Sequence, residues 1–184
     1  MGCSKFHTES GNVIITRSLL KDYGVDPAVD DNYAIKAAAR NNHAAIVRLL
    51  LRDDRVDPNV GGNMVLTRMA EFGHADVVYE LLTHPRWNRA SDLSAALTFA
   101  ARNGHAHVVG LLLERGADAS ADNSVAIREA AARGHEGVVG LLLMPGRADP
   151  AARNDLAIKL AARNCHAGVV QLLVNDPPSQ PSRQ

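Results

Sequence analysis

Histidine is the most regularly placed side chain in this sequence that could bind a metal ion. His43, His74, His105, His135 and His166 follow one another at intervals of 30 or 31 residues. Imidazole nitrogen is a common zinc ligand. If each histidine belongs to one copy of a stacked repeat, equivalent atoms lie about 8–10 Å apart, which is too far for neighbours to share an ion. We therefore predict no metal. Each imidazole should bind backbone groups near the start of the helix that follows it and tie neighbouring copies together.

Patterns that would support catalysis are missing. The sequence has no Gly-x-Ser-x-Gly turn, no phosphate-binding glycine loop, no His-Glu-x-x-His and no Cys-x-x-Cys. His135-Glu136 begins like a zinc-protease motif, but Val139 stands where the second histidine should be. We expect no enzyme, no cofactor and no small-molecule substrate.

The histidines mark copies of one phrase, best preserved from Ala100 to Leu113. A period of this length is typical of a solenoid. The predicted copies cover residues 32–62, 63–93, 94–123, 124–154 and 155–178, and a degenerate copy covers 1–31 with Asn12 in the histidine position. We expect a single domain over residues 1–178 and a disordered tail over 179–184.

Each copy has the apolar spacing of two short helices. Ile35, Ala38 and Ala39 follow helical spacing in the first, and Val108, Val109 and Leu112 in the second. Alternation with period two is missing, so no sheet is expected. We read the first helices as residues 33–42, 64–73, 95–104, 125–134 and 156–165.

Residues that favour helix ends border these segments. The predicted N-caps of the first helices are Asn32, Asn63, Ser94, Ser124 and Asp155. Before the histidine stand residues that tolerate the left-handed conformation, with Gly73, Gly104 and Gly134 as the glycines of the best copies. Cys165 is the exception and should cost about 1–2 kcal/mol there.

The phrase Ala100 to Asp118 resembles the ankyrin repeat, and the likeness recurs in register from about Asn12 to Val174. This resemblance implies an all-α solenoid of stacked helix-turn-helix units joined by β-turn "fingers", with the first helices lining a concave face. The family's Thr-Pro-Leu-His opening is absent. The linker from Asp118 to Val125 is about three residues short of the family norm, so we expect short fingers and no binding mode that needs long ones.

The first helices are rich in basic residues although the whole chain has a formal net charge of zero. A row of guanidinium groups suits carboxylates or phosphates, which arginine can bind with two hydrogen bonds. The resemblance places variable contact residues just before the glycine–histidine pair. The candidate partner-binding residues are Lys36, Arg40, Asn41, Glu71, Phe72, Trp87, Arg102, Asn103, Arg128, Arg133, Lys159 and Arg163. A merely solvated basic surface explains the same pattern equally well.

Trp87 is considered separately because it stands where Val56, Ala117 and Ala148 stand in other copies. A half-exposed tryptophan beside Arg86 could anchor an interface. The competing interpretation is a buried tryptophan that fills space left by smaller residues.

Net charge, aromatic content and hydropathy limit the classes of partner that the sequence favours. With zero formal net charge and 4% aromatic residues, the sequence favours neither nucleic acid nor anionic lipid. It has no apolar run long enough to span a membrane. Acylation at Gly2 and Cys3 is not expected, because Phe6 stands where the motif needs Ser or Thr. Cys3 and Cys165 should lie at opposite ends of the stack and stay reduced, which favours a cytoplasmic or nuclear monomer.

Together these features predict a non-catalytic protein–protein interaction module that binds another protein on its concave face, through an acidic segment of that partner. Two alternatives stay open. The chain could be a recognition fragment of a larger multi-repeat adaptor, or a stand-alone ankyrin-type inhibitor of an enzyme or transcription factor.

Overall fold

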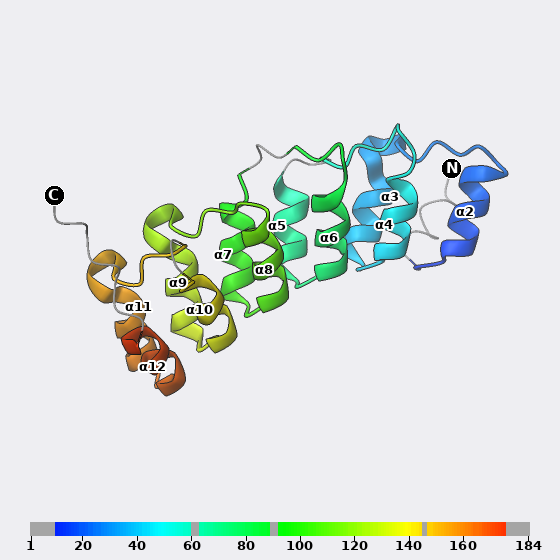
Figure 1. Cartoon of the computed structure of the whole chain (residues 1–184). Helices are drawn as coiled ribbons and strands as arrows, with labels where there is room; N and C mark the ends of the chain where they lie inside the picture. Colours follow the sequence, from blue (N-terminus) through cyan, green and yellow to red (C-terminus); the bar gives the residue numbers. More distant parts are fainter. Residues whose placement is uncertain (1–9, 60–62, 89–91, 145–146, 176–184) are drawn as a thin grey trace. The chain divides into compact units, whose positions relative to one another are not determined.

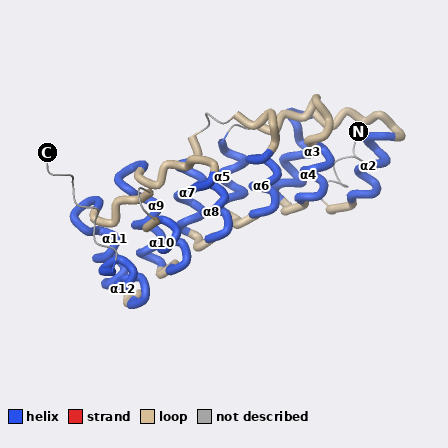
Figure 2. The backbone as a smooth tube through the Cα atoms, in the orientation of Figure 1, coloured by secondary structure: helices blue, strands red, loops and turns tan. Residues whose placement is uncertain are grey.

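The computed structural model describes residues 10–59, 63–88, 92–144 and 147–175. Within these ranges the chain forms helices joined by turns, and no strand is present (Figures 1 and 2). It divides into two compact units, Met1–Met69 with His74–Ser91, and Ala70–Gly73 with Asp92–Gln184. The single domain expected over residues 1–178 stays a prediction.

Most copies supply a first and a second helix. The first helices are α3 (Val29–Arg40), α5 (Asn63–Glu71), α7 (Ser94–Arg102), α9 (Ala121–Arg133) and α11 (Ala152–Arg163). The second helices are α2 (Val13–Lys21), α4 (Ala44–Leu50), α6 (Ala75–Thr83), α8 (Ala106–Glu114), α10 (Glu136–Leu142) and α12 (Ala167–Asn175). The predicted first helices therefore end within two residues of the observed ends.

The second unit has two layers of helices. Its first helices α7, α9 and α11 pack side by side, and its second helices α8, α10 and α12 form the other layer (Figure 1). Each first helix also packs on the second helix of its own copy. In the first unit, α4 contacts α3 of its own copy and lies between α2 and α6.

Small and branched apolar side chains fill the space between the helices. Leu112, Ile127 and Leu142 are fully buried in the second unit, as is Ile46 in the first. The paired alanines of the first helices are also fully buried, as at Ala100 and Ala101. Alanine has little bulk, so helices of neighbouring copies can approach closely, and burial of this apolar area is the main stabilising contribution to the fold.

Near their starts, two of the first helices, α3 and α9, contain a run of left-handed residues that forms a kink. Asp30, Asp31 and Asn32 have φ between 54° and 57°, and Asp122, Asn123 and Ser124 have φ between 50° and 57°. Asn and Asp adopt this region more readily than other residues with a side chain. The short fingers expected from the short linker stay a prediction.

The run also changes the role expected of the N-cap residues. Asn32 Oδ1 accepts a hydrogen bond from the backbone N–H of Asp57 at 3.1 Å, and Ser124 Oγ accepts one from Asp149 at 2.9 Å. Both acceptors therefore bind the turn at the end of their own copy and do not cap their own helix. Ser94 is the first residue of α7 and makes no side-chain cap either. The N-cap prediction is therefore wrong for these three residues. At Asn32 and Ser124 the backbone is left-handed and the side chain binds elsewhere in its own copy, and at Ser94 the helix starts one residue earlier than predicted.

Candidate functional site

Histidine and glycine form the junctions between copies in the second unit. Nε2 of His105, His135 and His166 lies 3.0, 3.0 and 3.2 Å from the carbonyl oxygens of Glu71, Arg102 and Ala132. These carbonyls belong to the end of the preceding copy's first helix. The expectation that the ring binds near the start of its own helix is therefore wrong, although the ring does link neighbouring copies.

Glycine makes room for these rings. Gly73, Gly104 and Gly134 have φ of 73°, 77° and 76°. A Cβ built on any of the three would lie 2.6 Å from Nδ1 of the histidine in the following copy, closer than real Cβ contacts come. The pairs are Gly73 with His105, Gly104 with His135 and Gly134 with His166. The imidazole thus occupies the space that a side chain would need, so these positions require glycine for two reasons.

Asparagine side chains reinforce two of the same junctions. Asn103 Nδ2 donates to the Glu71 carbonyl at 3.0 Å, and Asn164 Nδ2 donates to the Ala132 carbonyl at 2.7 Å. Each carbonyl therefore accepts from an imidazole and an amide at once. Asn103 was a candidate for partner binding, but its amide nitrogen is already used inside the array.

The junction before His74 differs because Asn42 replaces the glycine. Asn42 keeps the left-handed backbone, with φ 58°. Here Nδ1 of His74, and not Nε2, lies 3.2 Å from the carbonyl oxygen of Ala39, which is three residues before Asn42. Where this position has a Cβ, as in Asn42, the histidine ring of the following copy is placed differently.

The two outermost copies lack one half of this pair. At the first, Asn12 replaces histidine, and its Oδ1 accepts from the backbone N–H of Ile15 at 3.0 Å, capping its own helix. At the last, Cys165 replaces glycine with φ 62°, and its side chain is exposed. The predicted left-handed conformation at Cys165 is present. Cys3 lies outside the described residues.

Basic side chains on the first helices of the second unit surround one acid. Arg133 Nη1 lies 2.5 Å from Glu129 Oε2, and Arg102 Nε lies 3.8 Å from the same oxygen. The exposed fractions of the three side chains are 50% for Arg102, 37% for Arg133 and 34% for Glu129. Two guanidinium groups share one carboxylate, so this cluster keeps a positive charge at the surface.

The remaining basic candidates of this unit differ in availability. Arg128 donates to the backbone carbonyls of Asn123 and Asp122 at 3.2 and 3.1 Å, where it supports the left-handed run. Lys159 and Arg163 are exposed on α11. Arg128 therefore binds backbone carbonyls of its own helix, whereas Lys159 and Arg163 have exposed side chains.

Candidates nearer the N-terminus are less uniform. Lys36 Nζ pairs with Asp31 at 2.6 Å, and Asn41 Nδ2 donates to the Ala37 carbonyl at 2.9 Å. Arg40 is exposed at the end of α3. Past the end of α5, Phe72 is 54% exposed. Glu71 contributes its backbone carbonyl to the junction described above.

Trp87 does not belong to the candidate surface. Its side chain is only 8% exposed, so the expectation of a half-exposed anchor is wrong and the space-filling alternative holds. Neighbouring Arg86 is also engaged, since Nη1 donates to the Asp54 carbonyl at 2.8 Å and Nη2 to the Asp53 carbonyl at 3.2 Å. Arg86 thus binds carbonyls after the end of α4 in the preceding copy, which its surface-type sequence context did not reveal.

One finger carries a strongly shifted carboxyl group. Arg55 Nε and Nη2 donate to the two oxygens of Asp53 at 2.9 and 2.7 Å. These bonds stabilise the charged form and lower the pKa of Asp53 to about 2, against partial desolvation. This ion pair between Asp53 and Arg55 is local and orders the turn.

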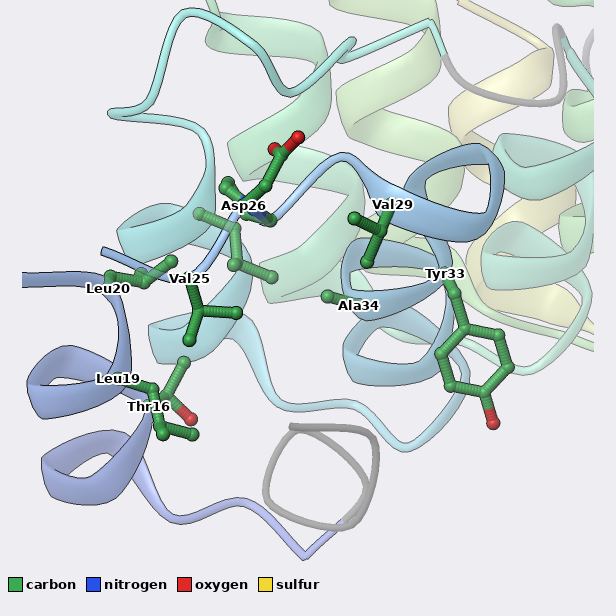
Figure 3. A pocket seen from close by; sticks show the side chains of 10 residues that line it. Thr16, Leu19, Leu20, Val25, Asp26, Val29, Tyr33 and Ala34 are labelled. Carbon is green, nitrogen blue, oxygen red and sulfur yellow. The ribbon is translucent and has the colours of Figure 1, made fainter. Parts of the chain in front are cut away.

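An apolar pocket lies in the first unit between α2, the turn after it and α3 (Figure 3). Its polar side chains are used locally. The Thr16 hydroxyl donates to the Asn12 carbonyl at 2.8 Å, and Asp26 accepts from the backbone of Ala28 at 3.0 Å. Leu19, Val25 and other apolar groups make up most of the lining. The pocket is therefore suited to packing and offers no acid–base pair.

The described residues offer neither a metal-binding cluster nor a membrane-spanning helix. No group of three His, Cys, Asp or Glu side chains in this part of the chain is arranged to hold a metal ion. None of its helices is both long and apolar enough to cross a membrane. Gly2 and Cys3, where acylation is not expected, lie outside the described residues.

Comparison with known proteins gives the family. The family model "Ankyrin repeats (3 copies)" matches residues 37–123, 66–154 and 97–183. No curated protein sequence matches the chain significantly.

Solved structures agree with that match. They include an ankyrin repeat domain from Acinetobacter baumannii AYE (19% identity, 95% of this chain and 97% of that chain covered, TM-score 0.74). The ankyrin repeat domain of Bcl-3, described as a member of the IkappaB family, has 22% identity, 96% and 86% coverage and a TM-score of 0.73. The human ASB11 ankyrin repeat domain has 18% identity, 100% and 87% coverage and a TM-score of 0.80. The fold is that of an ankyrin repeat solenoid, as the sequence predicts, and the chain belongs to the ankyrin repeat family.

Proposed function

We propose that this protein is a non-catalytic interaction module that binds an acidic segment of another protein. Ankyrin repeat domains are typically protein–protein interaction modules, and the chain belongs to that family. The observation that carries the finer proposal is the cluster of Arg102, Glu129 and Arg133, which we call the arginine cluster. It has two exposed guanidinium groups for one carboxylate.

The chemistry of the arginine cluster favours a carboxylate ligand. Arg102 reaches Glu129 only at 3.8 Å, so most of its five donors stay available. A partner carboxylate could accept two parallel hydrogen bonds from that planar group. Exposed Lys159 and Arg163 add positive charge on α11, the next first helix of the same unit. A partner segment with several acidic residues therefore suits this side of the second unit.

Charge reversal tests the proposal. A protein partner is first captured with the wild-type chain, and its dissociation constant is then measured for Arg102→Glu with Arg133→Glu. Affinity should fall by about tenfold or more, equivalent to at least about 1.4 kcal/mol. The melting temperature should stay nearly unchanged, because exposed ion pairs contribute only about 0–1 kcal/mol.

A matched control separates this surface from general electrostatics. Arg115→Glu with Arg153→Glu makes the same change in net charge at exposed sites away from the cluster. This control should keep most of the affinity. Equal weakening by both double variants would show a non-specific charge effect, and unchanged affinity in the first would remove the acidic partner.

Two more specific roles stay compatible with the same fold. A recognition fragment of a larger multi-repeat adaptor would bind its partner without changing the partner's activity. A stand-alone inhibitor would lower the activity of a bound enzyme or transcription factor. An activity assay on the captured partner, with and without this chain, distinguishes them.

A further inference from the structure

In the last copy, the side that corresponds to the one covered by a following copy elsewhere in the array is exposed. A groove on this side is lined by Ala162, Cys165, Ala167, Val170 and Val174, among others. In the two preceding copies, the residues equivalent to Val170 are Val109 and Val139, which are fully buried. Val170 is only partly buried, and Val174 is 61% exposed. We call this side of α11 and α12 the C-terminal face.

Cys165 makes this face selective for the copy that could dock on it. At the three glycine junctions the incoming imidazole fills the space of a Cβ, at 2.6 Å. Cys165 has the same left-handed backbone and carries both a Cβ and a sulfur atom. A histidine could not occupy its usual place there, and at Asn42, which also has a Cβ, the ring of His74 is placed differently.

The first copy is the one that brings no imidazole. In all the other copies a histidine precedes the second helix and reaches back toward the preceding copy, whereas Asn12 folds onto the N–H of Ile15 and caps its own helix. A copy that begins with Asn12 therefore leaves the space above Cys165 free.

Apolar residues next to Asn12 match the same face. Within the second unit, Gly137 lies against Ala106, with a Cβ on Gly137 placed 3.9 Å from the Ala106 Cβ. By repeat register, Ile14 corresponds to Gly137 and Ala167 to Ala106. Ile14 is 79% exposed. Ile15 is 36% exposed, although its equivalents Val138 and Val169 are almost fully buried.

From these matched features we propose that the C-terminal face binds the α2 end of a second copy of this chain, head to tail. The Cys165–Asn12 pair replaces the glycine–histidine pair of the internal junctions, and Ile14 covers Ala167. The contact continues the packing that joins consecutive copies within the chain. Because the two surfaces differ, such a contact produces a ring or an open series of oligomers and not a two-fold dimer.

Sedimentation velocity over a range of concentrations provides the first test. The buffer contains a reductant so that disulfides through the exposed Cys165 do not contribute. The expected result is a mean sedimentation coefficient that rises with concentration and extends beyond a dimer. A single monomer boundary up to about 1 mM, the weak limit of a specific contact, would overturn the proposal.

A residue exchange between the two surfaces provides the sharper test. Asn12→His introduces an imidazole whose position at the glycine junctions is blocked here by the Cβ and sulfur of Cys165, so association should fall by about tenfold or more. Cys165→Gly alone should leave association close to that of the wild type. The double variant rebuilds a glycine–histidine junction between molecules and should recover association to at least the wild-type level.

Recovery in the double variant also controls for folding. Loss of the Asn12 cap could unfold α2, but Cys165→Gly on another molecule could not repair that defect. Far-ultraviolet circular dichroism of each variant confirms that helix content is kept. If association resists Asn12→His, or if the double variant stays as weak as the single one, a different surface is responsible and the proposal fails.

Discussion

Gly73, Gly104 and Gly134 combine a positive φ with close contact to the imidazole of the following copy. Either condition alone disfavours a side chain, and together they make these residues sensitive points. The same site is occupied by Asn42 and Cys165 elsewhere, where the neighbouring ring is displaced or has no place. One residue position therefore controls how well two copies join.

Replacement of Gly104 by alanine should destabilise the protein. The new Cβ strains a backbone with φ 77° and collides with the ring of His135. These two costs together give an expected loss of about 2–4 kcal/mol in the free energy of unfolding. Urea unfolding of Gly104→Ala measures it, and a loss below half a kilocalorie would contradict the junction geometry.

The Asp53–Arg55 pair makes a pH-dependent contribution to stability. The pKa of Asp53 falls from its ordinary value of 3.8 to about 2, mainly through hydrogen bonds from Arg55. A lowered pKa stabilises the folded state above pH 4, and this contribution is lost as pH falls from 4 to 2. In Arg55→Ala the pKa should return toward 3.8. Carboxyl carbon shifts in an NMR titration test this, and an unchanged pKa would assign the shift to another cause.

Helices α8 and α10 contain glycines that no junction requires. A Cβ at Gly110 or Gly140 would meet nothing within 4 Å, and neither residue has a positive φ. Glycine inside a helix raises the entropy lost on folding without any compensating contact here. Elements of the same fold thus contain glycines with opposite roles.

Alanine at Gly110 should stabilise the protein, in contrast to alanine at Gly104. The expected gain is about 0.5–1 kcal/mol, because alanine is the better helix former. Thermal and urea unfolding of Gly110→Ala and Gly140→Ala check this. If either variant is destabilised to the same extent as Gly104→Ala, helix propensity is not the controlling factor.

At the scale of the molecule, stability should be a sum of local contributions. Repeat proteins bury their apolar surface between nearest neighbours, so distant copies share few contacts. Ile46 of the first unit and Ile127 of the second are both fully buried. Each junction can therefore be altered without direct effect on a remote one.

Paired substitutions measure this additivity. Ile46→Val and Ile127→Val should each cost about 0.5–1.5 kcal/mol through lost packing. The double variant should equal the sum within about 0.5 kcal/mol, as expected for sites without shared partners. A larger deviation in the free energy of unfolding would indicate coupling between the two units.

The sequence predicted more of the architecture than of the surface. The histidine period and the apolar spacing around Val108 and Leu112 were sufficient for the helix pairs, because they reflect packing that recurs in each copy. The roles of Asn32, Ser124 and Arg86 were missed, since these side chains bind groups 25 or more residues away whose position no local pattern encodes.

The interior copies with Gly73, Gly104 and Gly134 carry both partners of a junction, a glycine for the histidine of the following copy and a histidine that reaches the preceding copy. A duplicated segment from one histidine to the next, such as His105 to Gly134, would therefore bring its own glycine and histidine and fit between existing copies. An array built this way can lengthen or shorten by whole copies while every new junction keeps the old geometry. The thiol at Cys165 stands at the same position, and there the proposed neighbour is a copy without the histidine.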